Sequence, residues 1–276
     1  MSNTLILRES FDPLAFLETL EKEKVTILYA YPTMIHALVH HPAAKQYDYS
    51  SLRLGIYGGS AMPLATLGRA FEVFRCDFLQ RYGATECCGS GISVLSPQDH
   101  RQAMEGREEA RRRLTSAGRS TLGTLVKIVD EEGGKLTQPG STGEIAAKLN
   151  APMEGYWRRP EDTQETLKEG WLHAGDIGMK DEAGYLYIVD RKKDMIISGA
   201  RNIYPREIEE VLLTHPAVLE AAVIGVPDEY WGESVKAMVV LQQGMKATEE
   251  EIVAFCKKNL ASYKKPRFVE FVLSFL

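Results

Sequence analysis

The alternation of apolar runs and helical patterns in the first sixty residues constrains the fold most strongly. Thr4 to Leu7, Val25 to Ala30 and Leu52 to Tyr57 are strand-like. Helical patterns that open at Asp12-Pro13 and Pro32 lie between them. Strands that alternate with helices and are apolar on both faces indicate parallel βαβ units covered by helices. We therefore predict an α/β protein in which residues 1–114 form part of a large domain.

The pattern changes after Gly118. Leu122 to Val129, Gly143 to Leu149 and Gly184 to Val189 are strand-like, and acidic turns that contain glycine join them at residues 130–134 and 181–184. Such turns are typical of antiparallel hairpins. The sequence therefore predicts a small β-barrel-like subdomain over residues 115–189.

The stretch from Asp190 to Glu209 marks the boundary between two folding units. It leaves a strand, crosses Arg-Lys-Lys-Asp, passes Gly199 and enters a helix at Pro205, where the missing N–H of proline costs nothing. By itself the charged run is more often a solvated loop. Beyond it the pattern predicts a helix at 205–214, strands at 218–226, 235–241 and 268–272, and a capping box of Thr248 and Glu251 that opens another helix. We expect a hinge at 190–193 and an α+β cap domain at 194–276.

Composition excludes several classes of protein. Among 276 residues the formal net charge is −5, which argues against a nucleic-acid partner because such proteins carry a basic surface. The four cysteines show no metal-ligand or disulfide spacing and indicate reduced, cytosolic usage; they are Cys76, Cys87, Cys88 and Cys256. The first residues lack the order of a signal peptide, and no apolar run reaches the ~18 residues of a transmembrane segment. We expect a soluble, cytoplasmic protein.

Two loops at predicted strand ends carry residues suited to a flat, phosphorylated ligand. Ligands of parallel sheets bind beyond the carboxyl ends of the strands, where Gly58-Gly59-Ser60 stands. Glycine lets the backbone approach a ligand closely, although a tight turn explains these residues equally well. In the next loop Tyr82 offers an aromatic face, Thr85 a hydroxyl, and Glu86 a carboxylate oxygen of the kind that Mg²⁺ prefers.

A third loop candidate runs from Gly170 to Gly178. The Asp176 carboxylate, in what reads as a glycine-flanked turn, can accept both hydroxyls of a ribose diol. It can equally cap its own turn. We interpret His173 as structural, because no nucleophile stands beside it.

Taken together, these stretches resemble the adenylate-forming enzymes, the superfamily of acyl-CoA synthetases, firefly luciferase and peptide-synthetase adenylation domains. Asp190 to Glu209 resembles the hinge segment of that superfamily. Tyr82-Gly83-Ala84-Thr85-Glu86 matches its adenylate-binding loop without a gap, and Gly-Trp-Leu-His-Ala-Gly-Asp, which ends at Asp176, matches its ribose-binding element. The resemblance covers roughly Thr4 to the end of the chain.

The resemblance implies a role for each candidate residue. Tyr82 packs on adenine, Thr85 contacts the α-phosphate, Glu86 holds Mg²⁺, and Asp176 and Arg191 contact the ribose. It further implies that Gly58, Gly59, Ser60 and Gly83 lie beside the nucleotide, and that the acyl pocket includes Tyr31, Met34, Cys87 and Cys88.

The resemblance also implies a moving cap domain. Lys193 matches the residue about which the cap rotates between two half-reactions, so Thr85, Glu86 and Lys193 are the expected catalytic residues. Ser198, Gly199 and Arg201 match the turn that enters the site when coenzyme A binds. Ala200 stands where many relatives have glycine.

The implied activity is AMP-forming ligation of a carboxylic acid, with a fatty acid expected, to coenzyme A through an acyl-adenylate. ATP, Mg²⁺ and coenzyme A are the implied cofactors. The superfamily's phosphate loop and its closing Pro-x-x-x-Ser/Thr-Gly-Lys motif are not found, and Lys264 and Lys265 match a different, upstream element. We therefore expect an internal and C-terminal portion of an enzyme, inactive alone and prone to self-association through an uncovered sheet edge.

Two alternatives stay open. One is an adenylation enzyme with a different acceptor, such as a carrier-protein thiol or the oxygen of a luciferase. The other is a non-catalytic chain that keeps nucleotide contacts or only an interaction surface.

Overall fold

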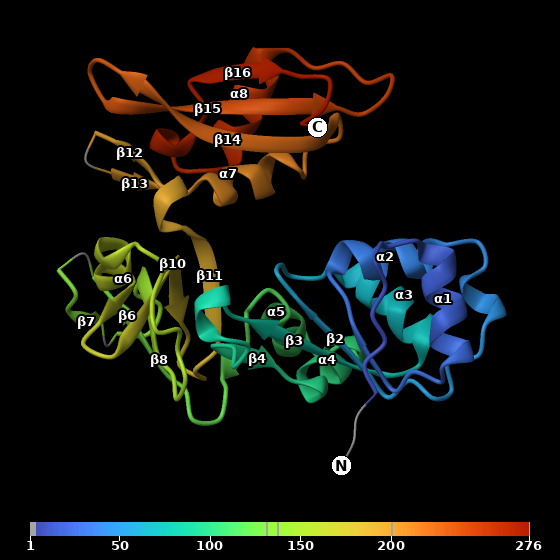
Figure 1. Ribbon diagram of the computed structural model, residues 1–276. Helices are drawn as coiled ribbons and strands as arrows, with labels where there is room; N and C mark the ends of the chain where they lie inside the picture. The colour runs from blue at the N-terminus through green and yellow to red at the C-terminus, as the bar shows by residue number, and fades with distance from the viewer. Residues whose placement is uncertain (1–3, 131, 137, 200, 276) are drawn as a thin grey trace.

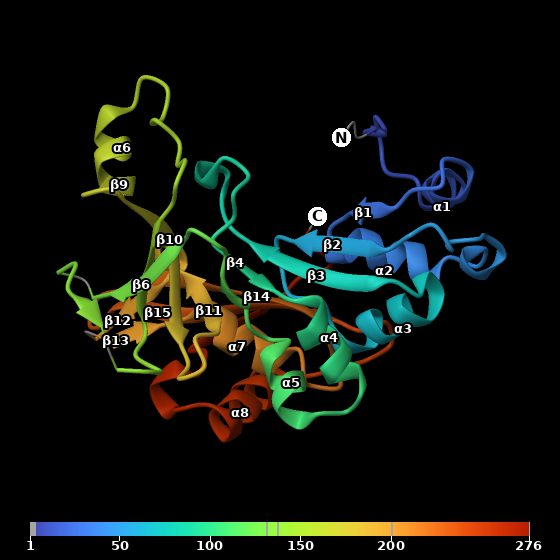
Figure 2. The same cartoon turned by 90° about the horizontal axis from the view of Figure 1, so that it is seen from below.

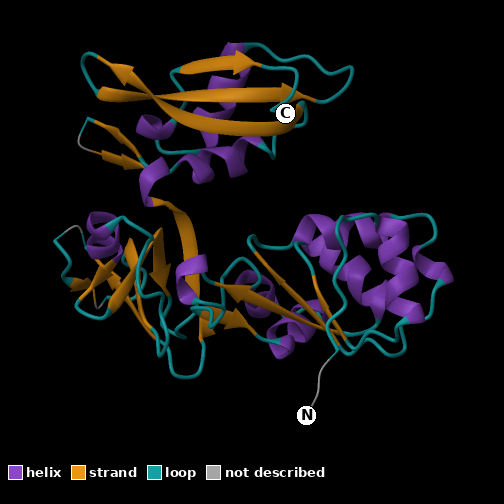
Figure 3. Ribbon diagram, in the orientation of Figure 1, coloured by secondary structure: helices purple, strands orange, loops and turns teal. Residues whose placement is uncertain are grey.

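The computed structural model describes residues 4–130, 132–136, 138–199 and 201–275, whose strands form three sheets (Figure 1). In Figure 1 the first sheet lies at the lower right, the second at the lower left and the third above both. Strand β11 and the short 3₁₀ helix η3 (Lys192–Asp194) lead from the second sheet into the third. Figure 3 shows that long helices accompany the first and third sheets, whereas the second is mostly strand.

The first sheet has the order β1-β2-β3-β4-β5. Its strands are β1 (Ile27–Tyr29), β2 (Leu54–Gly58), β3 (Asp77–Tyr82), β4 (Ser93–Leu95) and β5 (Arg119–Ser120). β1, β2 and β3 are parallel, which confirms the predicted βαβ units, while β4 and β5 pair antiparallel. In Figure 2, β2 and β3 run side by side as the longest strands of this sheet.

Five helices accompany the first sheet: α1 (Pro13–Lys22), α2 (Pro32–His40), α3 (Leu64–Phe74), α4 (Pro97–Met104) and α5 (Glu108–Arg113). α1 begins where predicted, because the Asp12 side chain accepts a hydrogen bond from the Ala15 backbone N–H at 2.7 Å. The predicted inward residues of α2, namely Ile35, Leu38 and Val39, are fully buried in the first core. The predicted strand at Thr4 to Leu7 is wrong: these residues form no ladder, and Leu5 and Leu7 are exposed.

The second sheet is antiparallel, with the order β11-β10-β8-β6-β7 and β9 paired to β10. Its strands are β6 (Leu125–Val129), β7 (Lys135–Leu136), β8 (Gly143–Lys148), β9 (Leu167–Lys168), β10 (Trp171–Lys180) and β11 (Leu186–Arg191), and helix α6 (Pro160–Thr166) precedes β9. The predicted antiparallel pairing is confirmed. The predicted glycine-flanked turn around Asp176 is wrong, because Trp171 to Gly178 belong to β10, and only Gly170 lies in the turn that precedes the strand.

The third sheet and two helices form the α+β unit. Its strands are β12 (Ile196–Ser198), β13 (Arg201–Ile203), β14 (Val218–Asp228), β15 (Gly232–Leu241) and β16 (Phe268–Phe271), and its helices are α7 (Pro205–Leu212) and α8 (Glu249–Asn259). β16 runs parallel to β15, whereas the other pairs are antiparallel. The capping box is confirmed: the Glu251 backbone N–H donates to Thr248, and the Thr248 backbone N–H donates to the Glu251 carboxylate.

Gly118 joins the first two sheets. Its carbonyl accepts from the Leu186 backbone N–H at 2.8 Å, and the Leu186 carbonyl accepts from the Ala117 N–H at 2.7 Å. Buried Tyr185 adds a hydrogen bond from its hydroxyl to the Asp99 carboxylate at 2.6 Å. These contacts hold the segment before β5 and helix α4 against the start of β11. Since β5 pairs with the first sheet beyond residue 114, the division at 114/115 stays a prediction.

No helix within the described ranges combines the length and apolar character that a membrane crossing requires.

Candidate functional site

Tyr82, Asp176 and Arg191 meet where the first sheet touches the second. Tyr82 is the last residue of β3, and its hydroxyl donates to Asp176 Oδ2 at 2.6 Å. Asp176 on β10 lies directly opposite Arg191 on β11, and Arg191 Nε is 3.4 Å from Asp176 Oδ1. Tyr82 and Arg191, from separate parts of the sequence, therefore both contact the Asp176 carboxylate, as expected for a common site.

The backbone around Asp176 is an irregular strand. Gly175 has a φ of +69°, a conformation that L side chains rarely adopt. The pairing of β10 shifts register between His173 and Ile177 toward β8, and between Ile177 and Gly178 toward β11. Bulges of this kind re-aim side chains beside functional sites. The irregularity places Asp176 toward Tyr82 without a turn.

The environment of Asp176 disfavours its ionised form. Burial raises the pKa of the Asp176 carboxyl, and the negative charges of Asp190 and Glu86 act in the same direction. The Tyr82 hydrogen bond and the Arg191 guanidinium oppose this increase but do not cancel it. Burial, followed by the nearby Asp176 charge, also raises the pKa of Tyr82, so its hydroxyl remains a donor at neutral pH. An ionised Asp176 can therefore gain from additional hydroxyl donors.

Replacing Asp176 by asparagine should raise the melting temperature of the ligand-free chain at neutral pH. A carboxyl whose pKa is higher in the folded state favours folding while it is protonated, and that contribution is lost as pH rises through the folded-state pKa. Asparagine stays neutral and can still accept from Tyr82. In thermal unfolding experiments, the melting temperature of the asparagine variant should exceed that of the unchanged chain by an amount that grows as the pH rises from about 4 to about 8. A lower melting temperature for the asparagine variant throughout would contradict this.

Glu86 lies in the 3₁₀ helix η2 (Thr85–Cys87), which follows β3. The Tyr156 hydroxyl donates to Glu86 Oε1 at 2.6 Å, and the Met153 N–H donates to the Glu86 carbonyl at 2.9 Å. Sequence reasoning missed Tyr156, because nothing local to Gly155-Tyr156-Trp157 indicates a partner 70 positions away. Thr85 is exposed beside Glu86.

The carboxylate of Glu86 fits Mg²⁺ shared with a ligand. Mg²⁺ in phosphate-handling sites is held by one or two carboxylates together with substrate phosphates and water. Within the part of the chain that the structure describes, no cluster of three or more histidine, cysteine or acidic residues could cage a metal. The single carboxylate of Glu86 therefore fits a metal ion that is held partly by phosphate oxygens.

The glycines near the end of β2 permit close packing. A Cβ on Gly58 would lie 2.7 Å from the Arg81 carbonyl oxygen, and one on Gly59, whose φ is +85°, would lie 3.2 Å from the Tyr31 ring. Similarly, a Cβ on Gly83 would be 3.0 Å from Gly91 Cα. Backbone packing therefore requires glycine at position 58, the left-handed φ favours glycine at position 59, and the fit at Gly83 is tight. Ser60 follows Gly59 in an exposed bend.

The proposed acyl-pocket residues occupy different environments. Tyr31 is exposed at the start of α2, whereas Met34 is partly buried against the first core. Cys87 is only 1 % exposed and packs in the core of the second sheet, while Cys88 is exposed. The structure therefore does not bring these four side chains together on one surface.

The hinge segment is fixed on both sides. Lys192 Nζ lies 2.9 Å from Glu144 Oε2, which His173 Nδ1 also approaches at 3.1 Å. Buried Asp190 accepts from the backbone N–H groups of Arg191 at 2.7 Å and Arg206 at 3.0 Å. Exposed Lys193 stands between these anchors in η3. Sequence reasoning missed the contacts of Glu144 and Asp190. The Glu144 contact with Lys192 depends on strand register, and the Asp190 contact with Arg206 depends on where α7 begins.

Ser198 ends β12 and Arg201 begins β13, where the two residues pair, and Gly199 follows Ser198. Gly199, with a φ of +55°, donates its N–H to the Trp231 carbonyl at 2.8 Å. A Cβ there would lie 2.5 Å from the Trp231 ring, so this position requires glycine. The Arg201 guanidinium lies over the Tyr263 ring at 4.6 Å. Ala200 lies outside the described residues.

Comparisons with known proteins agree with this arrangement. Residues 2–157 match the AMP-binding enzyme family, and residues 207–276 match the AMP-binding enzyme C-terminal domain. A long-chain-fatty-acid–CoA ligase of Bacillus subtilis is 42% identical over 267 residues, which are 97% of this chain and 46% of that protein. The chain spans about half the length of the curated relatives it matches.

Two solved structures are also similar. The amide bond synthetase McbA from Marinactinospora thermotolerans superposes with a TM-score of 0.81 at 40% identity, covering 97% of this chain and 53% of that one. The O-succinylbenzoate coenzyme A synthetase from Bacillus subtilis, in complex with AMP, has a TM-score of 0.79 at 34% identity, covering 98% and 52%.

Proposed function

Because this chain belongs to the AMP-binding enzyme family of adenylate-forming enzymes, we propose that its parent activity is the AMP-forming ligation of a carboxylic acid to coenzyme A. The observation that carries the proposal is the convergence of Tyr82 and Arg191 on the Asp176 carboxylate. A carboxylate flanked by a donor fork and an aromatic ring suits a nucleoside, since it offers acceptors to the ribose diol and a face to the base.

The proposed reaction has two steps. A substrate carboxylate oxygen bonds to the α-phosphorus of ATP, and the bond to the pyrophosphate leaving group breaks. The thiol of coenzyme A then attacks the acyl carbon, its proton passes to solvent, and AMP leaves with the electron pair of the mixed-anhydride bond. Negative charge builds on the α-phosphate in the first step, so catalysis depends on positioned donors and cations.

Each site residue receives a proposed role. Asp176 and Arg191 orient the ribose, Tyr82 packs on adenine, and Thr85 donates to the α-phosphate. Glu86 would hold Mg²⁺, which neutralises phosphate charge when bound. Gly58, Gly59, Ser60 and Gly83 let backbone approach the nucleotide.

The cap domain has a proposed role in the second step. Lys193 is the proposed point about which it turns: Lys192, just before it, is held by Glu144, and the hydrogen bond from the Arg206 N–H to Asp190 spans it. Ser198, Gly199 and Arg201 then approach coenzyme A, and Tyr31, Met34, Cys87 and Cys88 stay proposed as acyl-pocket residues. A cytoplasmic location and self-association also stay predictions.

A second candidate function uses another acceptor. The amide bond synthetase is as similar to this chain as the fatty-acid ligase is, and its name indicates an amine acceptor. The proposed adenylate step is common to both. A non-catalytic nucleotide-binding chain, or one that offers only an interaction surface, would differ from both by releasing no AMP.

Replacing Tyr156 by phenylalanine should weaken Mg²⁺-dependent ATP binding more than Mg²⁺-free AMP binding. The hydroxyl fixes the Glu86 carboxylate, and the loss of one such hydrogen bond typically costs about 0.5–1.5 kcal/mol, or roughly two- to tenfold in affinity. Calorimetric titration of both nucleotides measures the difference, with Tyr230→Phe, at an exposed tyrosine in the cap domain, as a control. Equal losses for ATP and AMP would remove Tyr156 from the metal side of the site.

The proposed activity is tested in a chimera in which the 276 residues of this chain replace the matching half of the Bacillus subtilis fatty-acid ligase. We expect acid-dependent AMP release that Asp176→Ala abolishes, with coenzyme A as the preferred acceptor over amines and carrier proteins. Preference for an amine would favour the second candidate. AMP binding to the 276-residue chain provides a second readout, so that a chimera that fails to fold does not decide the question. AMP release that survives Asp176→Ala would overturn the proposed site.

A further inference from the structure

Two adjoining cavities lie on the second sheet and are lined by none of the proposed nucleotide-site residues. One has a volume of ≈ 320 Å³ and the other ≈ 390 Å³, at the lower end of the roughly 300–1,000 Å³ typical of small-molecule sites. Both are lined by Val126, Lys127, Lys135 and Lys180. We call this surface the lysine groove, which also includes Leu125 and Trp171.

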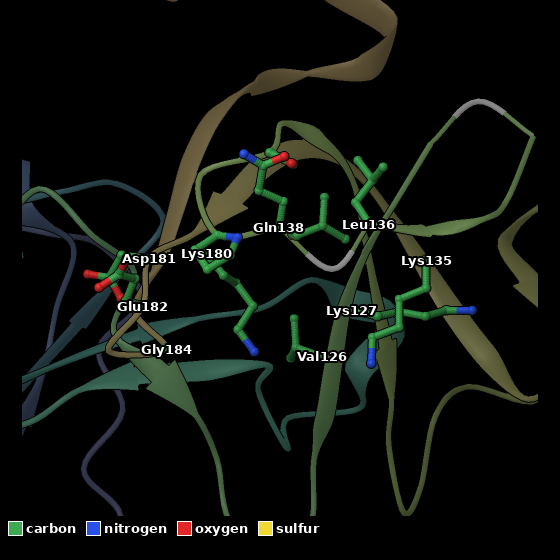
Figure 4. A pocket seen from close by; sticks show the side chains of 12 residues that line it. Val126, Lys127, Lys135, Leu136, Gln138, Lys180, Asp181, Glu182 and Gly184 are labelled. Carbon is green, nitrogen blue, oxygen red and sulfur yellow. The ribbon is translucent and has the colours of Figure 1, made fainter.

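The lysine groove brings positive charge together from three strands. Lys127 comes from β6, Lys135 from β7 and Lys180 from β10. Figure 4 shows the side chains of Lys135 and Lys180 extending toward Val126 from opposite sides. The Lys127 ammonium lies over the Trp171 ring at 4.4 Å. The convergence therefore results from the sheet rather than from a run of lysines in the sequence.

Among the residues that the structure describes, no carboxylate forms an ion pair with these three ammonium groups. The lysine ion pairs found among the described residues are those of Lys192, Lys236 and Lys264. The smaller cavity is also lined by Asp181 and Glu182, whereas the described residues that line the larger one include the three lysines and no acidic residue. Lys135 and Lys180 extend toward the same residue, Val126, so an anion placed between them would be attracted by both positive charges.

The wall of the larger cavity is apolar. It is formed by Leu125, Val126 and Trp171, with the hydroxyl-bearing residues Ser120 and Thr124 at its edge. Leu125 is 62 % exposed, so its side chain is accessible to a ligand at this wall. A ligand that fits this groove therefore needs both an anionic group and an apolar body.

We propose that the lysine groove binds an organic phosphate monoester. The phosphate lies between the ammonium groups of Lys135 and Lys180, since lysine binds phosphate as a point charge. The aryl or alkyl body lies on Leu125, Val126 and Trp171. This site is independent of the proposed nucleotide site and does not rest on the proposed function.

Trp171 provides a local reporter for the test. The other two tryptophans, Trp157 and Trp231, are replaced by phenylalanine, and phenyl phosphate is titrated while indole fluorescence is followed. We expect saturable quenching that weakens as salt screens the charges. Phenyl phosphate should bind more tightly than inorganic phosphate, and phenol should not saturate. Equal affinity for inorganic and phenyl phosphate would overturn the assignment to an organic phosphate.

Charge variants test the proposed contacts. In the Lys135→Met/Lys180→Met double variant, the loss of two charged contacts should weaken phenyl phosphate binding at least about tenfold. Glu182→Gln should tighten binding. The exposed lysines of a Lys45→Met/Lys246→Met control lie outside both cavities, so binding should not change, nor should it change in Asp176→Ala. Undiminished binding to the groove double variant would overturn the site.

Discussion

Replacing Gly118 by alanine is expected to destabilise the chain by about 2–6 kcal/mol, since a left-handed non-glycine residue and an overpacked contact each cost roughly 1–3 kcal/mol. Gly118 has a φ of +81°, and a Cβ there would lie 1.9 Å from the Val94 carbonyl oxygen and 2.3 Å from the Leu95 nitrogen. Both contacts are backbone atoms of β4, which cannot turn away as a side chain can. To relieve the steric clash, β4 must move away from residue 118, whose carbonyl accepts the Leu186 hydrogen bond that joins the two sheets.

A matched glycine isolates the steric part of this effect. Gly170 has a similar φ of +77°, but a Cβ there would meet nothing within 4 Å. Gly170→Ala should therefore cost only the backbone strain, about 1–2 kcal/mol. Urea unfolding of the two variants measures the difference. If Gly118→Ala is no less stable than Gly170→Ala, the junction is not as tight as described.

Replacing Asp176 by alanine is expected to weaken AMP binding roughly a hundredfold or more, since two charge-assisted hydrogen bonds to the ribose, each worth about 1.5–3 kcal/mol, would be lost. The carboxylate is also the shared partner of Tyr82 and Arg191, so its removal leaves the ring and the guanidinium without their common acceptor. Isothermal titration with AMP measures the change.

The control for this variant is Asp77→Ala. Asp77 begins β3 in an ion pair with Arg101, at the opposite end of the strand from Tyr82, so AMP affinity should not change. Circular dichroism of both variants establishes that the fold persists. Unchanged affinity in Asp176→Ala would remove this carboxylate from the nucleotide site.

Most of the local structure could be predicted because it depends on neighbouring residues. Asp12 before α1 and the Thr248–Glu251 capping box satisfy backbone N–H groups within one helical turn, and Pro32, at the start of α2, lacks an N–H that would be left unpaired there. The failures involve distant residues. Asp176 was predicted in a turn because glycines flank it, yet pairing of β10 with β8 and β11 makes that segment a strand.

The site could be predicted only in part, for the same reason. Tyr82, Asp176 and Arg191 were singled out individually by chemistry and resemblance, and the structure places them together. The partners of Glu86 and Lys192, which are Tyr156 and Glu144, follow from tertiary packing and have no local signal. Cys87 was placed in the acyl pocket by resemblance, whereas its thiol is buried in the second core.

A crystal structure of the 276-residue chain with AMP tests the proposed nucleotide site most directly. We predict that the two ribose hydroxyls lie within hydrogen-bonding distance of the Asp176 carboxylate, with Arg191 alongside and the adenine against the Tyr82 ring. AMP bound elsewhere, with Asp176 still held only by Tyr82 and Arg191, would contradict the assignment.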